Sequence, residues 1–268
     1  MRVIAFLALA SFIFAILAVV LAIAGKITPQ TLQTAFGSDE VRFAIVLSLK
    51  SAFLATLFAL LVGVPSAYAL ARFDFGGKEI LDSLIDLPVV LPPLISGFGL
   101  LIFFGETPVG KFISDHIVRV VFTPAGIIVA QFFVATPFVI RTARAVFESI
   151  DSKYELIAQS LGSSRLESFL RVTMPMAKRG ILAGAILAWA RCMGEFGATL
   201  MLAGATKMRT ETLPIAVFLN ISVGNVELAL AIAFIMLLIA ILTILSIKLV
   251  ASLSGRNPSN RKSSYPSS

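Results

Sequence analysis

The chain has 268 residues, of which 58% are hydrophobic and only 14% are charged. Soluble domains carry about a quarter charged residues, so this composition excludes an ordinary soluble enzyme and indicates an integral membrane protein. The net charge of +7 comes from basic residues that lie between apolar runs, which indicates membrane topology and argues against nucleic-acid binding.

The first two apolar runs predict membrane-spanning helices at about 3–24 and 43–71. Residues 22–24 read Ala-Ile-Ala, which resembles a signal-peptide cleavage site. The run before them is longer than the apolar region of a usual signal peptide, which is about 7–15 residues. We therefore predict an uncleaved span, followed by a polar loop over 25–41.

The third apolar run, at about 84–104, contains Pro88, Pro92 and Pro93. Proline removes a backbone donor and breaks or kinks a helix. Broken helices at membrane depth are tolerated where they line a cavity or are buried in protein. These prolines therefore predict a broken helix, which serves either as a packing kink or as part of a transport pathway.

Three further runs predict spans at about 124–147, 181–203 and 228–253, and the Ser- and Asn-rich tail over 254–268 is predicted to be disordered. Six spans place both termini on one side of the membrane. That side receives more than twice as many basic residues as the other, so we assign it to the cytoplasm. The expected architecture is all-α, with 1–253 as the transmembrane domain.

A polar segment over 148–179 separates the fourth and fifth apolar runs on the cytoplasmic side. Ser152 is a candidate N-cap for a short helix, and Gly162 is suited to the left-handed conformation that ends one. Ser163 or Ser164 is placed to cap a second short helix, which Pro175 bounds. The segment is too polar to span a bilayer, so it is either a docking element for a partner or a connecting loop.

The fifth run contains two charges at helical spacing, Arg191 and Glu195. An unpaired charge at the bilayer centre costs several kcal/mol, so they form either a structural ion pair or part of a pathway. Gly180 and Gly184 have the spacing that lets helices approach closely. Phe196 lies among small residues, where its ring either packs or closes a narrow pore.

Sequence motifs for catalysis and metal binding are missing from the chain. There is no G-x-x-x-x-G-K-[ST] loop for ATP, no H-E-x-x-H and no C-x-x-C. With one histidine, His116, and one cysteine, Cys192, we expect no catalytic residues, no bound metal and no enzymatic activity.

The segment from Glu155 to Pro175 resembles the cytoplasmic "EAA" loop of ABC importer permeases, with Gly162 and Pro175 at the positions of the motif's glycine and proline. The motif is degenerate, because its glutamate position falls on Leu156 and Glu155 is shifted by one. Residues 86–93, 189–199 and 211–214 are similar to molybdate, tungstate and sulfate permeases. The resemblance covers about 40–250.

The resemblance implies a homodimer that forms the translocation pathway for a tetrahedral oxyanion, most like molybdate or tungstate. Two cytoplasmic ATPase subunits would hold ATP and Mg, and an extracytoplasmic binding protein would deliver the anion. This chain would bind no cofactor. The resemblance implies ATPase coupling through Glu155, Ala158, Gly162 and Pro175, and a pathway or gate formed by Arg191, Glu195, Phe196, Gly197, Ala198 and Thr199.

Three alternatives to a molybdate or tungstate permease remain at this point. A sulfate or thiosulfate permease would share these motifs. A stand-alone carrier or channel is less favoured, because carriers often show internal repeats and no convincing duplication is visible. A membrane enzyme has the least support.

Overall fold

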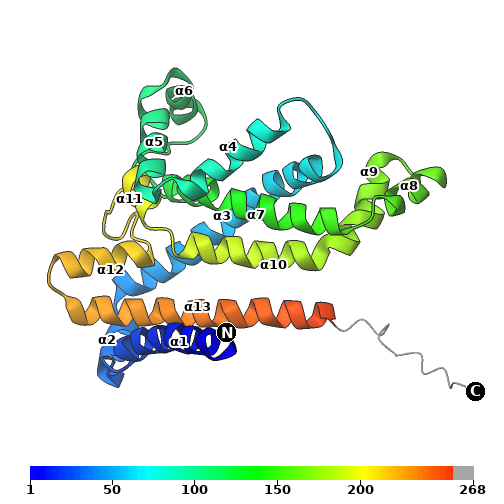
Figure 1. Ribbon diagram of the computed structural model, residues 1–268. Helices are drawn as coiled ribbons and strands as arrows, with labels where there is room; N and C mark the ends of the chain where they lie inside the picture. Colours follow the sequence, from blue (N-terminus) through cyan, green and yellow to red (C-terminus); the bar gives the residue numbers. More distant parts are fainter. Residues whose placement is uncertain (256–268) are drawn as a thin grey trace, which may run out of the picture.

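The computed structural model describes residues 1–255, and every regular element within them is a helix (Figure 1). The predicted disordered tail lies outside these residues except for its first two positions. The helices are α1 (Arg2–Ala24), α2 (Pro29–Gly37), α3 (Asp39–Arg72), α4 (Lys78–Val90), α5 (Pro93–Glu106), α6 (Pro108–His116), α7 (Pro124–Ser149), α8 (Lys153–Ser160), α9 (Arg165–Ser168), α10 (Met174–Met193), α11 (Gly197–Ala203), α12 (Leu213–Ser222) and α13 (Val226–Gly255).

Helices α3, α7 and α10 pack against one another and form the centre of the fold. Their contacts depend on small residues, since without a hydrophobic driving force membrane helices associate by close backbone approach. A methyl group added at Gly63 would lie 2.8 Å from the Val139 side chain. Gly180 and Gly184 face Val146 and Thr142 of α7 equally closely, which confirms that this pair serves helix packing.

Four helices in the described part of the chain are long and apolar enough to cross a membrane, namely α1, α3, α7 and α13. The count rises to six if each of two bent helix pairs is one span. The α4–α5 pair bends by 111°, and the helix Arg165–Met193 bends by 61° where it meets α11. The span predicted over 181–203 is therefore interrupted, because the helix breaks at residues 194–196.

The break in the third apolar run falls at Leu91 and Pro92, between α4 and α5. Pro92 is the N-cap of α5 and Pro93 occupies its first turn, where the missing N–H is not needed. Pro88 lies inside α4 and does not end it, so only two of the three prolines lie at the break. The predicted polar loop over 25–41 contains α2, and the short helices α6 and α12 lie between the predicted spans.

The two ends of the bundle carry different short elements (Figure 1). Helices α8 and α9 lie together at the right of the view, near the last turns of α7. Helices α2, α11 and α12 lie at the left. Helix α3 has 34 residues and therefore spans about 50 Å, enough to link the two ends.

Candidate functional site

The segment after α7 contains two short helices joined at a sharp turn. Gly162 adopts φ +95°, a left-handed conformation that glycine accepts without strain, and it separates α8 from α9. Ser164 caps α9 by accepting from the Glu167 N–H, and the Glu167 carboxylate accepts from the Ser164 N–H in return. Ser152 precedes α8 without a side-chain capping bond.

The second helix of this segment is not a separate unit. It runs through a π-helical turn, Phe169–Thr173, directly into α10. Pro175 therefore lies exposed in the first turn of α10 and does not end a helix, because proline is tolerated there. A π-helical turn often marks a functional position. Here it joins the α8–α9 segment to the fifth apolar run.

Large apolar side chains of α8, of α9 and of the turn between them are exposed. Leu156 and Ile157 are more than half exposed, and Leu161 is 83% exposed. Leu166 of α9 continues this surface, while Ala158 is partly buried. Contiguous exposed apolar surface on a polar segment is typical of a site for a protein partner. We call Leu156, Ile157, Leu161 and Leu166 the docking surface.

Glu155, which precedes Leu156 on α8, is buried. Its carboxylate accepts hydrogen bonds from the Tyr68 hydroxyl at 2.7 Å, the Arg72 Nε at 3.1 Å and the Thr173 hydroxyl at 2.6 Å. Burial opposes its ionisation, but the Thr173 and Tyr68 bonds and the Arg72 charge outweigh burial and hold the pKa of Glu155 below its ordinary value. These four residues form the Glu155 cluster.

The sequence analysis did not identify the partners of Glu155. Tyr68 and Arg72 are four residues apart at the end of α3 and therefore share one helix face. That spacing was the available signal for a polar cluster at the end of α3. An arginine at the end of a span is otherwise explained by membrane topology. No sequence signal pointed to Thr173, since its position depends on the π-helical turn.

The second candidate site lies where the two bent helix pairs meet. Helix α5 packs on α11 without intervening side chains. A methyl group at Gly97 would lie 2.6 Å from the Ala198 backbone, and one at Gly197 would lie 3.0 Å from the Leu94 nitrogen. Both glycines are therefore required for contact between the segments that follow the two breaks.

Arg191 and Glu195 form an ion pair at 2.6 Å across the end of α10. The Glu195 side chain is 1% exposed, and its second oxygen accepts from the Ala198 N–H at the start of α11. A carboxylate at a helix N-terminus is favourable because it faces the positive end of the helix dipole. Glu195 thus connects the two halves of the bend, which favours the structural interpretation of this pair.

The other residues predicted at this site have distinct surroundings. Phe196 is half-buried and its ring packs against Phe218 of α12, with the ring centroids 5.5 Å apart. Ala198 and Thr199 are fully buried. Gln131 of α7, which the sequence analysis did not identify, donates to the Cys192 carbonyl at 3.0 Å. As a lone polar residue in an apolar run, it was detectable in principle.

A further polar cluster lies at the other end of α3. Glu40 accepts from the Asn220 amide at 2.8 Å and forms an ion pair with Lys207, while the nearby Glu211 carboxylate accepts from the Met208 N–H at 2.8 Å. Burial raises the pKa of Glu211 to about 6, with Glu40 adding to the shift and the Met208 N–H opposing it. We call these residues the Glu40 cluster.

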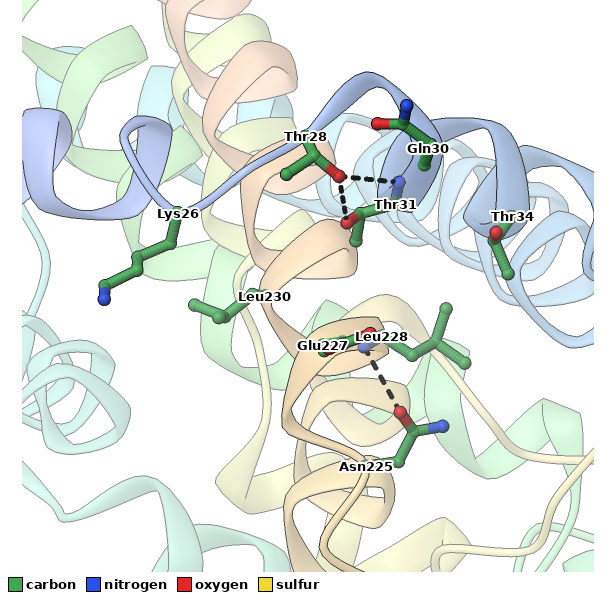
Figure 2. A pocket seen from close by; sticks show the side chains of 9 residues that line it. All are labelled: Lys26, Thr28, Gln30, Thr31, Thr34, Asn225, Glu227, Leu228 and Leu230. Atoms are coloured by element: carbon green, nitrogen blue, oxygen red, sulfur yellow. Dashed lines mark hydrogen bonds between the residues drawn. The ribbon is translucent and has the colours of Figure 1, made fainter.

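A hollow of about 380 Å³ separates the start of α2 from the start of α13 (Figure 2). Thr28 and Thr31 line it from α2, and Asn225 caps α13 by accepting from the Leu228 N–H. The lining contains one lysine, Lys26, and one glutamate, Glu227, so its charge selects neither an anion nor a cation.

The candidate spans, two of them interrupted, define the described residues as a helical membrane protein. Among residues 1–255, no cluster of His, Cys, Asp or Glu is suited to hold a metal ion. A family model described as "Binding-protein-dependent transport system inner membrane component" matches residues 59–253, and the chain belongs to this family. It is a permease subunit of an ABC transporter and is not the ATPase.

The relatives include permeases named for molybdenum and permeases named for sulfate. A probable molybdenum ABC transporter permease of Haloferax volcanii is 40% identical over 231 residues, covering 86% of this chain and 82% of the relative. The molybdenum permease ModB of Escherichia coli is 36% identical, covering 74% and 90%. The sulfate permease CysT of Salmonella typhimurium is 35% identical, covering 82% and 79%.

Solved structures share the fold at low sequence identity. A bacterial alginate ABC importer matches with a TM-score of 0.72 at 17% identity, covering 94% of this chain and 95% of that one. The inward-facing MetNI methionine transporter matches with a TM-score of 0.62 at 15% identity, covering 81% and 99%. These likenesses support the architecture and carry no information on the substrate.

Proposed function

We propose that this chain is the membrane-spanning subunit of an ATP-driven importer for molybdate or tungstate. The observation that carries the proposal is the 40% identity to a permease named for molybdenum, over most of both chains. Two copies form the pathway with six spans each, and both termini face the cytoplasm. An extracytoplasmic binding protein delivers the anion.

The docking surface is the part of the chain that meets the ATPase. Its large apolar side chains lie on α8 and α9 at one end of the bundle, and Gly162 sets the turn between the two helices. The family's partner, a cytoplasmic ATPase subunit that holds ATP and Mg, covers this surface. Ala158 and Gly162 permit the close approach, because neither side chain projects far.

The anion passes beside the junction of α5 and α11. Two helix breaks meet there, and interrupted helices at membrane depth line cavities or pathways. Phe196 closes the pathway in the resting state, and the buried residues Gly197 to Thr199 hold α11 against α5 beside it. The site binds the anion weakly, since conduction requires that the ion also leave.

A sulfate importer is the second candidate. The observation that favours it is the 35% identity to the sulfate permease CysT over 220 residues. That identity is only slightly below the value for the molybdenum permease, and the two anions have the same tetrahedral shape and charge.

Uptake by proteoliposomes tests both candidates. Vesicles hold this chain with its neighbouring ATPase and binding protein, and labelled molybdate, tungstate and sulfate are supplied outside. We expect ATP-dependent uptake of molybdate or tungstate that a hundredfold excess of sulfate does not suppress. Full suppression by sulfate supports the second candidate. Uptake by this chain alone, without ATPase or ATP, overturns both.

A further inference from the structure

The Glu155 cluster joins three segments that are far apart in the sequence. Tyr68 and Arg72 come from α3, Glu155 from α8, and Thr173 from the π-helical turn before α10. Arg72 also donates to the Ile150 carbonyl at 2.8 Å, at the end of α7. The connection from α7 into α8 is thus tied to α3 at two points by one guanidinium group.

Aromatic packing fixes the hydroxyl group that Glu155 accepts from. The Tyr68 ring lies 4.5 Å from the Phe169 ring and 5.5 Å from that of Phe147, measured between centroids. Phe169 and Thr173 are the two ends of the π-helical turn, and both contact residues of the cluster. The π-helical turn therefore contacts the Glu155 cluster with one apolar side chain, Phe169, and contributes one polar side chain, Thr173, to it.

Beside the cluster lies an open hollow of about 720 Å³. Tyr68, Arg72 and Glu155 of the cluster form part of its lining. Pro65 and Phe73 line it from the side of α3, and Leu156 and Leu166 line it from α8 and α9. Helix α8 therefore meets α3 through the polar bonds of Glu155 and not across a filled apolar interface. Buried hydrogen bonds to a charged group fix a geometry strongly, because leaving either partner unpaired is costly.

We propose that Glu155 is a positioning residue that makes α8 and the end of α3 move as one body, and that it does not contact the ATPase. This inference rests on the proposed function. Movement of the docking surface then passes directly to α3, which packs along α7 and α10 through the whole bundle. Without the cluster, the ATPase still binds, but its movement shifts α8 relative to α3 and does not reach the rest of the bundle.

The test compares two adjacent substitutions on α8 in the proteoliposome system. Glu155→Gln keeps the shape and removes the charge from the buried face. Leu156→Ala truncates the exposed docking surface. Three quantities are measured for each variant: ATPase that co-purifies with the chain, ATP hydrolysis and anion uptake.

For Glu155→Gln we expect unchanged co-purification of the ATPase and about a tenfold fall in uptake per ATP hydrolysed, since one to two charge-assisted bonds are lost. For Leu156→Ala we expect weaker co-purification of the ATPase and a fall in total uptake in proportion to it. Tyr68→Phe removes one of the same bonds without disturbing ring packing. The double variant Tyr68→Phe/Glu155→Gln should be no worse than Glu155→Gln, because the two residues act as one unit.

Two results would overturn the inference. Loss of ATPase co-purification in Glu155→Gln, in proportion to the loss of uptake, would make Glu155 a docking contact. Additive effects of Tyr68→Phe and Glu155→Gln on uptake per ATP would mean that the two side chains act separately. Failure of the proposed function gives a different result, since the unsubstituted chain would then retain no ATPase.

Discussion

The two ends of α3 carry polar clusters of opposite design. In the Glu155 cluster, a single carboxylate accepts from two hydroxyl groups and one guanidinium group, so every charge has a buried partner. In the Glu40 cluster there are two carboxyl groups and one lysine, which pairs with Glu40 and whose side chain is 64% exposed. The negative and positive charges of the Glu155 cluster are therefore equal in number. The Glu40 cluster has one carboxylate more than it has cations, unless one of its carboxyl groups holds a proton.

This difference in charge gives the two clusters opposite pH dependences of stability. The lowered pKa of Glu155 means that its stabilisation is present above the ordinary value of 4.5 and is lost only as the pH falls through the lower folded-state value. The raised pKa of Glu211 has the opposite sign. Its stabilisation is present below 4.5 and is lost as the pH rises to about 6.

Removing the charge of Arg72 should give the largest effect. Arg72→Ala leaves Glu155 ionised and buried, and breaking a buried pair from one side costs about 3 kcal/mol of unfolding free energy. Thermal unfolding of the purified chain in detergent measures the loss. Arg42→Ala, near the other end of α3, is the control, because its pair with Asp39 is exposed and contributes less than about 1 kcal/mol. Equal losses of unfolding free energy in the two variants would contradict the stronger stabilisation expected from the buried pair.

Substitution of one left-handed glycine at each end of the bundle should separate an effect on stability from an effect on ATPase binding. Gly162→Val and Gly224→Val both place a branched residue at positive φ with open space around it, at a cost of about 1–2 kcal/mol each. Unfolding should therefore shift similarly in both. Only Gly162→Val should reduce ATPase co-purification, since it alone sets the angle of the docking surface. The reverse pattern would place docking at the other end.

Neutralising Glu211 should remove a pH effect. Glu211→Gln keeps an acceptor for the Met208 N–H, which donates at 2.8 Å, and removes the buried negative charge. We expect the loss of stability between pH 4.5 and about 6, about 1 kcal/mol in the unsubstituted chain, to vanish in the variant. Unfolding curves across that range measure it, and an unchanged pH slope would show that Glu211 does not hold the proton.

Neutralising Glu155 should have no such pH signature. In Glu155→Gln, stability should be lower than in the unsubstituted chain by a constant amount from about pH 5 to 8, because Glu155 is fully ionised over this range. A pH-dependent difference within that range would contradict the lowered pKa of Glu155 and, with it, the charge balance of the Glu155 cluster.

The amino-acid sequence by itself determined that this chain is helical and membrane-embedded. Long apolar runs can satisfy their backbone groups in a bilayer only within helices. Local chemistry also located the turn at Gly162 and the pairing of Arg191 with Glu195, since both depend on residues within one or two helical turns.

The tertiary structure decided what periodicity leaves open. The break inside the fifth apolar run has no proline, and it forms where Gly197 and Gly97 let α11 pack directly on α5. The orientation of Glu155 is a stronger case. Its inward position depends on Tyr68 and Arg72, which are more than eighty residues away, and on a π-helical turn that rotates Thr173 toward it. Contacts between distant segments set these positions, and no local pattern encodes them.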